Sequence, residues 1–380
     1  MEQFGWSRAT TSAAISLQRT ETGVISPFVG WFIDKFGPQK VMLFGTLLIS
    51  LGFIILSRIN TLWQFYAAFT IITIGLSFGT FLVVTTTVAN WFVQKRSRAM
   101  SITMAGSALG GVLVPLLVWL IAATDWRTGI LIVGIGFLFV GIPVSLTMRS
   151  RPEEYGLMPD GKNLTPQGRN QGISKSMSQV GSIVENTFTA KQAMATKAFW
   201  QLALSMGASG LVISASIHHI PAITSFGMSR TLGSMVIVGV SLFSVAGRLA
   251  TGYLGDTFDK RKLIAIAFML QFVGTIVFAL STTTWHLFIF LAAWGFGFGA
   301  SIPIRFALIA DLFGRQHYGT VMGTMMTTST IFSVMGPVIV GWIYDIRGNY
   351  REPFLLIACT VLVAIPLILT LQQPKNQDSN

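Results

Sequence analysis

Residues 30–40 read GWFIDKFGPQK and separate two long apolar runs. A degenerate copy, GYLGDTFDKRK, occupies residues 252–262. Two further pairs recur at nearly the same offset: Ala89-Asn-Trp-Phe92 with Ala310-Asp-Leu-Phe313, and Asp125-Trp-Arg127 with Asn349-Tyr-Arg351. Because these matches keep their order, they predict an internal duplication whose two halves enter the membrane in the same orientation.

The composition indicates a membrane protein. Of the 380 residues, 52% are hydrophobic and 11% are charged, whereas a soluble domain carries about 25% charged residues. Apolar runs of about 20 residues match the length of a helix that crosses a bilayer, and lipid leaves such a run no other regular state. We predict an all-α polytopic fold with eleven spans, at roughly 9–33, 41–57, 63–89, 99–123, 128–148, 199–220, 233–255, 263–281, 286–310, 320–343 and 354–371.

The net charge of +12 reflects membrane topology rather than nucleic-acid binding. If the Lys35–Lys40 loop is cytoplasmic, most of the 26 Lys and Arg residues fall on the same side, as the positive-inside rule expects. We therefore predict a multi-pass protein of the plasma (bacterial inner) membrane with a cytoplasmic C-terminus. Its predicted parts are an N-terminal bundle (1–148), a mostly flexible cytoplasmic connector (149–198), a C-terminal bundle (199–372) and a tail (373–380).

The two predicted bundles differ by one span. The second holds six and the first holds five, and the repeat places residues 30–40 after the second helix of its half. The segment Phe4-Gly-Trp-Ser-Arg8 is therefore expected to be the external loop after a first helix that this sequence lacks. An apolar segment of about 20 residues encoded upstream would agree with that expectation.

The loop at 30–40 resembles the signature of the major facilitator superfamily. Further segments resemble its monocarboxylate-transporter and oxalate/formate-antiporter branch: Ser26-Pro27, Trp91-Phe92, Arg151-Pro-Glu-Glu-Tyr-Gly-Leu-Met-Pro-Asp160, His218-His219-Ile-Pro221 and Gly247-Arg248-Leu249. The resemblance implies a twelve-helix fold of two parallel bundles and transport by alternating access. It also implies that the loop residues gate transport, namely Gly30, Asp34, Gly37, Gly252 and Asp256.

Asp34 is poorly placed at the end of its own helix, where the helix dipole is negative. Two partners would suit its carboxylate: the N-terminus of another helix, or a basic residue such as those of the Lys95/Arg96/Arg98 cluster. Either contact would bias the protein toward one conformation. The alternative is that Asp34 is a solvated loop charge.

Three arginines lie within predicted spans, and the most isolated is Arg19. About 17 Å and about 22 Å of helix separate it from Arg8 and Asp34. Because an arginine at mid-membrane costs about 2.5–3.5 kcal/mol on the mildest scale, it should face a cavity or a partner. Its helix face carries Ser12 and Ser16, whereas Glu21 points elsewhere.

Arg248 and Arg305 are the other two. Arg248 matches the helix-eight arginine with which monocarboxylate and oxalate carriers bind carboxylate, but Ser244 replaces an acidic residue of some carriers. The helix-eleven lysine of the oxalate carriers is also absent from the 320–343 span. Arg305 is about 9 Å of helix from the cytoplasmic end and could reach it. The alternative is that all three arginines tie helices together.

These patterns predict a secondary active transporter of a small organic anion, such as a carboxylate, and no enzymatic activity. The alternatives are a carrier of a neutral or cationic solute, and a transport-inactive sensor or subunit. The expected partners are the anionic substrate, lipid, and protons or a counter-anion. We expect a monomer with no cofactor, no metal and no nucleic acid. Candidate substrate-binding residues are Arg19, Arg248, Arg305, Ser16, Ser244 and Ser301; Glu21 is the candidate for proton coupling, and His218 and His219 for an outer gate.

Overall fold

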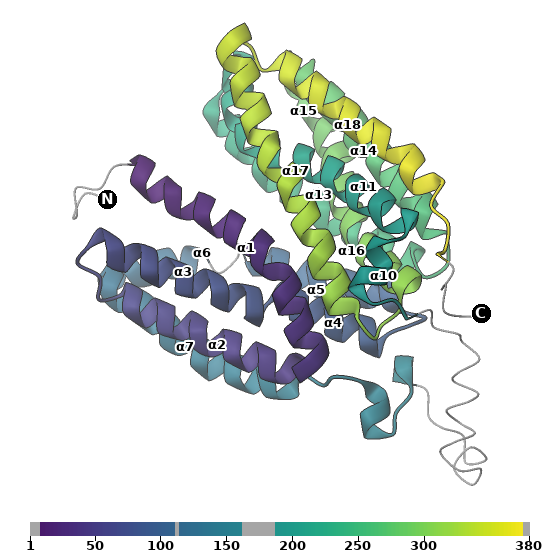
Figure 1. Ribbon diagram of the computed structural model, residues 1–380. Coiled ribbons are helices and arrows are strands. Elements are labelled where there is room, and N and C mark those ends of the chain that lie inside the picture. Colours follow the sequence, from purple (N-terminus) through teal and green to yellow (C-terminus); the bar gives the residue numbers. More distant parts are fainter. Residues whose placement is uncertain (1–7, 111–113, 162–186, 375–380) are drawn as a thin grey trace. The chain divides into compact units, whose positions relative to one another are not determined.

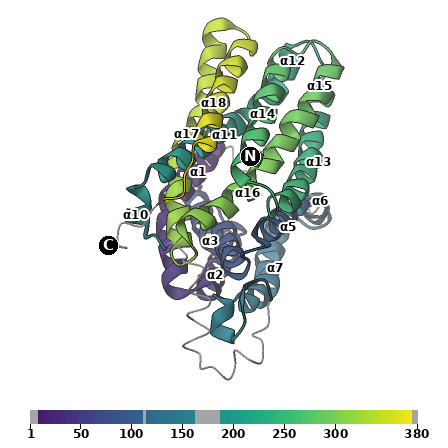
Figure 2. The ribbon, with the colours of Figure 1, turned by 90° about the vertical axis from the view of Figure 1, so that its right-hand side faces the viewer.

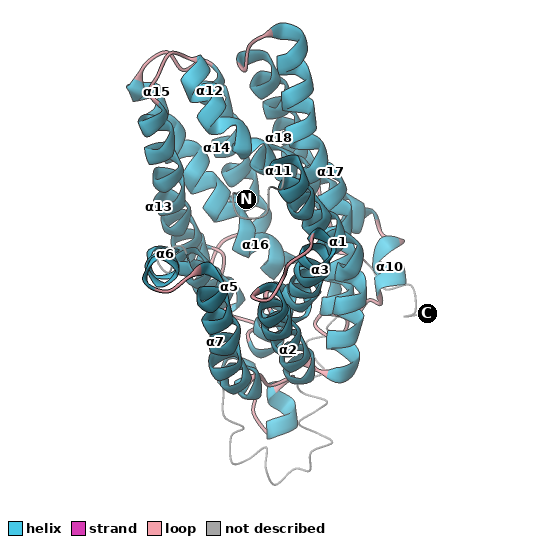
Figure 3. Ribbon diagram, turned by 90° about the vertical axis from the view of Figure 1, so that its left-hand side faces the viewer, coloured by secondary structure: helices cyan, strands magenta, loops and turns pink. Residues whose placement is uncertain are grey.

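The computed structural model describes residues 8–110, 114–161 and 187–374, without the side chains of residues 8–17, 19, 20, 108, 109, 114, 115 and 161. Within these ranges the chain consists of helices and loops, with no strand (Figure 3). Nine helices of the described chain are long and apolar enough to cross a membrane. The prediction of an all-α polytopic fold is confirmed.

The chain forms two compact units that each draw on both halves of the sequence. Unit 1 contains residues 1–93, 109–190 and 313–327, and unit 2 contains residues 94–108, 191–312 and 328–380. The helix that starts at residue 96, in the first half of the sequence, therefore begins in unit 2. The helix that starts at residue 318, in the second half, begins in unit 1. These two helix starts, at residues 96 and 318, prove important for the candidate gate.

Unit 1 contains most of the purple and blue ribbon in Figure 1. Its elements are α1 (Arg8–Phe36), α2 (Pro38–Leu56), α3 (Leu62–Gly79), α4 (Phe81–Trp91), α6 (Val114–Ala123), α7 (Trp126–Thr147), the turns η2 (Pro152–Tyr155) and η3 (Pro159–Gly161), and the start of α17 (Tyr318–Arg347). α2 packs against both α3 and α7. A Cβ at Gly45 would overlap the backbone of Gly79, so α2 and α3 touch backbone to backbone, as small residues permit between membrane helices.

The loop signature makes the corner between α1 and α2. Gly37 has φ +83°, a value that glycine adopts without strain. Pro38 follows as the first residue of α2, where its missing N–H has no helical partner to lose. Gly37 thus turns the chain sharply after Asp34, and its role in gating stays a prediction.

The predicted span 63–89 is interrupted at Thr80, which separates α3 from α4. Thr80 has φ −129° and ψ −107°, outside the helical region. Its hydroxyl donates back to the Leu76 carbonyl at 2.6 Å. The predicted span is confirmed, since residues Leu62–Trp91 are long and apolar enough to cross a membrane. The break within it lies where Gly79 meets α2, a tertiary contact that local periodicity does not encode.

Unit 2 includes the green and yellow helices, and Figure 2 shows α13, α14 and α15 running alongside one another. Its elements are most of α5 (Arg96–Leu109), α10 (Ala190–Met194), α11 (Lys197–Ser214), η4 (Ala215–His218), α12 (His219–Ser225), α13 (Arg230–Leu254), α14 (Lys260–Ala279), α15 (Thr284–Phe290), η5 (Leu291–Gly295), α16 (Phe296–Phe313), the remainder of α17, and α18 (Arg351–Leu369). α14 packs against α18 and η5.

The predicted span 286–310 contains one turn of π-helix. This turn is η5, which joins α15 to α16, and Phe290 and Phe296 on either side keep helical dihedral angles. A Cβ at Gly274 of α14 would lie within 3 Å of Trp294 in the π turn. The π turn is therefore packed directly on α14.

The start of the predicted flexible connector is ordered against unit 1. Trp91 Nε1 donates to the Arg149 carbonyl at 2.9 Å, and Asn90 Nδ2 donates to the Ser150 carbonyl at 3.2 Å. Asp160 accepts a hydrogen bond from the backbone of Val93 at 3.2 Å. The prediction of flexibility was wrong for residues 149–160, and residues 162–186 lie outside the described part of the chain.

Candidate functional site

The candidate site in unit 2 begins with a close contact between α13 and α16. A Cβ at Gly247 would overlap the carbonyl oxygen of Phe296, and a Cβ at Gly299 would overlap that of Ser244. Glycine is needed at both positions because the two backbones meet there. The contact fixes Ser244 and Arg248 of α13 beside the first turns of α16.

Arg248 is 9% exposed. Its Nη1 donates to the carbonyl of Met104 on α5 at 2.8 Å, and its guanidinium carbon lies 5.9 Å from the centre of the Phe298 ring. Its Nε is enclosed and has no hydrogen-bond partner among the described residues. Arg248 is therefore held by a neutral carbonyl and an aromatic ring.

Arg305, on α16, is 5% exposed. Its Nε donates to the Ser301 carbonyl at 3.1 Å, and its guanidinium carbon lies 5.9 Å from the Phe268 ring centre. The Nε therefore bonds one turn back along α16, away from the Phe313 end. The hypothesis that Arg305 reaches the cytoplasmic end was wrong, because the side chain is enclosed among helices of unit 2.

A neutral polar network lies beside Arg305. Gln271 Nε2 donates to Ser301 Oγ at 3.2 Å and to the Gly297 carbonyl at 3.1 Å, and Ser209 Oγ donates to Gln271 Oε1 at 3.0 Å. Ser209, Gln271 and Ser301 are all 0% exposed. The Ser301 hydroxyl, predicted to bind substrate, is thus engaged with Gln271.

A third buried arginine of unit 2 has a different environment. Arg96, whose side chain is 3% exposed, forms an ion pair with Asp311, and Lys260 Nζ lies 2.8 Å from the other oxygen of the same carboxylate. Among the described residues, no Asp or Glu forms an ion pair with Arg248 or Arg305. Unit 2 therefore buries two guanidinium groups that have no carboxylate partner within the described chain.

In unit 1, Asp34 binds the start of α17. Its carboxylate accepts hydrogen bonds from the backbone N–H of Gly319 at 3.0 Å, and from the N–H and hydroxyl of Thr320 at 2.8 and 2.6 Å. A Cβ at Gly30 would overlap the Gly319 carbonyl. Of the two partners that the sequence suggested for Asp34, the structure shows the helix N-terminus, where a carboxylate is stabilised.

In unit 2, Asp256 binds the start of α5. Its Oδ1 accepts a hydrogen bond from the backbone of Ser97 at 2.8 Å, and Arg98 Nε lies 3.2 Å from its Oδ2 without hydrogen-bond geometry. A Cβ at Gly252 would lie within 3 Å of the Ser101 side chain. The repeated loop sequence thus makes the same kind of contact twice.

Comparison with known proteins agrees with this architecture. A family model of the Major Facilitator Superfamily matches residues 1–229 and 199–380. The chain belongs to this superfamily. Rat monocarboxylate transporter 13 is 22% identical over 374 residues, covering 96% of this chain and 80% of the relative. The oxalate:formate antiporter of Oxalobacter formigenes is 25% identical over 379 residues, covering 96% and 83%.

Solved structures of the superfamily share the fold. The Escherichia coli fucose:proton symporter superposes with a TM-score of 0.72 at 13% identity, covering 97% of this chain and 92% of that chain. The human organic anion transporter MFSD10 superposes with a TM-score of 0.71 at 16% identity, covering 93% and 82%. At such identities the likeness concerns the fold alone.

The other residues that the sequence singled out lie on α1. The side chains of Arg19 and Ser16 are outside the described part of this superfamily member, so their predicted role stays a prediction. Both carboxylate oxygens of Glu21 are enclosed and have no hydrogen-bond partner among the described side chains. Among the described residues, no three His, Cys, Asp or Glu side chains come together as metal ligands.

The two adjacent histidines have different environments. His218 Nε2 lies 3.1 Å from the Pro337 carbonyl of α17. His219 is 4% exposed, and its ring centre lies 4.7 to 5.4 Å from those of Phe278, Phe290 and Trp294. His219 is a packed residue of the unit 2 core, and His218 connects the end of η4 to α17.

The carboxylate shared by Arg96 and Lys260 was not predicted from the sequence. Asp311 lies in the repeated segment Ala310–Phe313, at the position that Asn90 holds in the first copy. The contacts of Arg315 with Glu153 at 3.1 Å and with the Asn90 carbonyl at 2.8 Å were also not predicted. The repeat could have directed attention to Asp311, since an acidic residue there differs from its counterpart.

Proposed function

We propose that this protein is a secondary active transporter of a small organic anion, with a carboxylate as the charged group. The observation that carries the proposal is the pair of buried guanidinium groups, Arg248 and Arg305, that have no carboxylate partner among the described residues. A buried charge is costly unless it is paired. An anionic substrate would supply the missing charge, and arginine can bind a carboxylate with two parallel hydrogen bonds.

The relatives support this substrate class. Two of them are named monocarboxylate transporter and oxalate:formate antiporter, although their identities to this chain are 22% and 25%. In our proposal the protein lies in the plasma membrane, the bacterial inner membrane, with the Lys35–Lys40 loop on the cytoplasmic side. A gradient of protons or of a counter-anion drives transport.

In the proposed cycle, the contacts of Asp34 and Asp256 with helix starts form in one state and break in the other. Each contact joins a loop of one sequence half to a helix of the other half. Alternating access by two repeats that rock against each other requires contacts of this kind at one end. Gly30 and Gly252 allow the close approach on which both contacts depend.

The test is uptake into liposomes of a panel of carboxylates, sugars and amines, with thermal stabilisation of the purified protein as a binding assay. We expect carboxylates alone to be transported. Arg248→Gln should weaken carboxylate binding about 10- to 100-fold, because it removes a hydrogen bond to a charged group, and Arg305→Gln should weaken it to a similar or smaller extent.

Arg58→Gln is the matched control, since Arg58 is exposed in the turn after α2. Carboxylate binding that survives in both Arg248→Gln and Arg305→Gln would refute the proposal. Transport of sugars or amines with no response to carboxylates would favour a carrier whose arginines are structural.

A further inference from the structure

In unit 2, α5 is attached to α13 and the loop after it at two points. At the start of α5, the backbone N–H of Ser97 donates to Asp256 at 2.8 Å. About two turns further along the helix, the carbonyl of Met104 accepts the hydrogen bond from Nη1 of Arg248, also at 2.8 Å. The segments that make these contacts all belong to unit 2. The proposed anion site and one of the proposed gate contacts are therefore joined through a single helix.

The contact at the start of α5 is incomplete. Ser97 Oγ, Ser101 Oγ and Asp256 Oδ2 are enclosed without a hydrogen-bond partner among the described residues, and the two serines are 0% and 1% exposed. The guanidinium carbon of Arg98 lies 4.8 Å from the ring centre of Tyr253, and the side chain of Arg98 is partly exposed to solvent, which screens its charge. Because an enclosed polar atom without a partner destabilises the arrangement that encloses it, the Asp256 contact alone holds α5 weakly.

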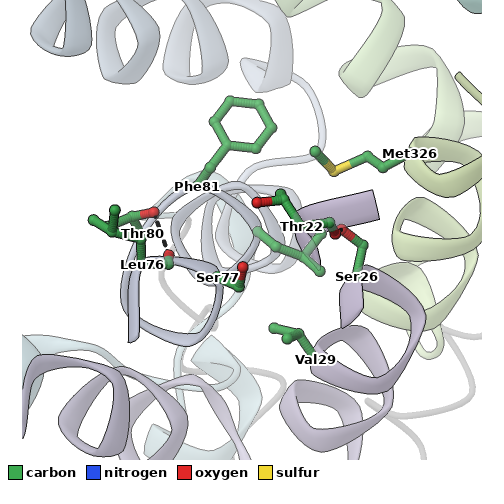
Figure 4. Close-up of a pocket in the computed structure, with 9 residues that line it drawn as sticks. Thr22, Ser26, Val29, Leu76, Ser77, Thr80, Phe81 and Met326 are labelled. Atoms are coloured by element: carbon green, nitrogen blue, oxygen red, sulfur yellow. Dashed lines mark hydrogen bonds between the residues drawn. The ribbon is translucent and has the colours of Figure 1, made fainter. Parts of the chain in front are cut away.

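Unit 1 has no cation at the position of Arg248. In the repeat, Ser26 of α1 is equivalent to Arg248, and Met326 of α17 is equivalent to Met104. The Ser26 hydroxyl donates to a carbonyl of its own helix at 2.6 Å. Ser26 and Met326 both line a cavity of about 430 Å³, and none of the described residues of its lining is charged (Figure 4). The guanidinium that reaches across to the partner helix in unit 2 has no counterpart here.

The start of α17 is held by a complete set of hydrogen bonds. The carboxylate of Asp34 accepts three of them, and no side-chain oxygen of Asp34 or Thr320 is enclosed without a partner. Further along α17, the hydroxyl of Thr327 donates to the carbonyl of Gly23 on α1 at 2.5 Å. No cationic side chain takes part in these bonds, so a bound anion would have no attachment of α17 to displace.

A carboxylate bound to Arg248 would compete with the carbonyl of Met104. Nε of Arg248 is enclosed, so a carboxylate that accepts two parallel hydrogen bonds would use the two Nη atoms. One of them, Nη1, is the atom bonded to Met104. The carboxylate carries a full charge and accepts from both atoms at once, whereas the carbonyl is neutral and accepts from one. Binding of the anion would therefore remove the second attachment of α5.

We propose that binding of an anion at Arg248 releases α5 and so opens the Asp256 contact, while the Asp34 contact stays closed. The inference rests on the proposed function and assigns to the substrate an action on one of the two gate contacts. In the empty protein Arg248 is a positioning residue for α5, and in the loaded protein it binds the substrate.

Hydrogen–deuterium exchange of the purified protein tests this inference, because it reports how often each helix start opens. Without any substrate, Arg248→Gln should raise exchange at the start of α5 about tenfold, since the variant loses a hydrogen bond from a charged donor. Exchange at the start of α17 should not change. Arg305→Gln is the matched control, because Arg305 is also buried but donates to a carbonyl of its own helix. This control should leave both helix starts unchanged.

A second arm adds a ligand to the wild type. Acetate should raise exchange at the start of α5 about fivefold, at a concentration that stabilises the protein against heat. Acetamide, its neutral counterpart, should have no effect. In Arg248→Gln, acetate should add nothing to the exchange that the variant already shows.

Equal exchange at the start of α5 in the wild type, Arg248→Gln and Arg305→Gln would overturn the inference. A rise in Arg248→Gln that extends equally to the start of α17 would also overturn it, and so would acetate that stabilises the protein without changing α5. Failure of acetate to bind would count against the proposed function alone, because the comparison of the two variants needs no ligand.

Discussion

Asp34 and Asp256 hold equivalent places in the two copies of the loop sequence, and each binds the start of a helix from the other sequence half. Asp34 accepts three hydrogen bonds from neutral groups, two of them from Thr320. Asp256 accepts one backbone hydrogen bond and lies beside the cation of Arg98. The same motif can therefore bind the start of a helix in two ways. One aspartate uses hydrogen bonds from neutral donors alone, and the other also uses attraction to a nearby cation.

The same contrast extends to the next repeated segment. In unit 2, Asp311 supplies a carboxylate to Arg96 and Lys260. In unit 1 the equivalent residue is Asn90, which has no charge to supply, and Arg315 instead pairs with Glu153 from the segment after α7. Unit 1 therefore obtains from the connector the carboxylate that unit 2 carries on a helix.

The largest loss of stability is expected when the ion pair of Arg96 with Asp311 in unit 2 is removed. Arg96→Gln removes a nearly buried partner of Asp311 and should lower the free energy of unfolding by about 3 kcal/mol, at the lower end for a buried pair because Lys260 remains. Thermal unfolding of the purified protein measures it. Arg58→Gln should change little, and an equal effect in both variants would contradict the importance of the pair.

The next largest loss of stability is expected to differ between Asp34 and Asp256. Asp34→Asn places an amide where three donors converge and should cost about 2 kcal/mol, whereas Asp256→Asn should cost about 1 kcal/mol. Only the second cost should shrink as salt is raised from about 0.05 to about 0.5 M, because Arg98 is partly exposed. The measurement is unfolding temperature against NaCl concentration, and equal salt dependence would remove the distinction.

A smaller loss of stability tests whether Glu153 plays in unit 1 the role that Asp311, a carboxylate on a helix, plays in unit 2. The partly exposed Glu153–Arg315 pair should contribute about 0.5 kcal/mol, seen in Glu153→Gln. Asn90→Asp gives unit 1 the residue found in unit 2, so Glu153→Gln should cost less in that background. A double-mutant cycle with full additivity would show that the two carboxylates do not replace each other.

The smallest loss of stability concerns the N-cap residue of α7, Asp125, which can titrate, whereas its equivalent in the other repeat cannot. Hydrogen bonds from Thr128, and then from the Arg127 backbone, lower the pKa of Asp125 at the N-terminus of α7. A carboxyl group whose pKa is lowered by folding stabilises the folded state at pH values above its ordinary pKa. That stabilisation is lost as the pH falls through the pKa of the folded state. The equivalent Asn349 cannot titrate.

Asp125→Asn should therefore be less stable than the wild type at pH 7, and the difference should disappear as the pH falls below the ordinary range of an aspartate carboxyl group and through the lowered pKa of Asp125. Unfolding temperatures of both proteins across this range check the expectation. A difference that persists at low pH would mean that the charge of Asp125 is not its source.

The sequence predicted much of this architecture because its information is local. Length and apolarity identified the nine spans that the described part of the chain contains, and the loop signature lies at the corner of Gly37 and Pro38. The break at Thr80 was not predictable in this way, since the run from Leu62 to Trp91 is uniformly apolar. Its cause is the contact of Gly79 with α2, which arises only on packing.

The candidate site was predictable in residue type and not in geometry. An arginine in an apolar span indicates a buried charge, which fits Arg248 and Arg305. The pairing of Arg96 with Asp311, 215 residues apart, carries no local signal. The direction of Arg305 also depends on which neighbouring helices enclose it, and a count of residues to the end of α16 does not contain that information.

The π turn Leu291–Gly295 has a consequence for everything that follows it on α16. A turn of this kind holds one residue more than an α-helical turn, and one residue corresponds to about 100° of rotation. Deleting a single residue from the π turn would rotate Ser301 and Arg305 to another face of α16, while every membrane span would remain. An insertion or deletion in the π turn would therefore redirect the proposed substrate-binding side chains of α16 without changing their identity.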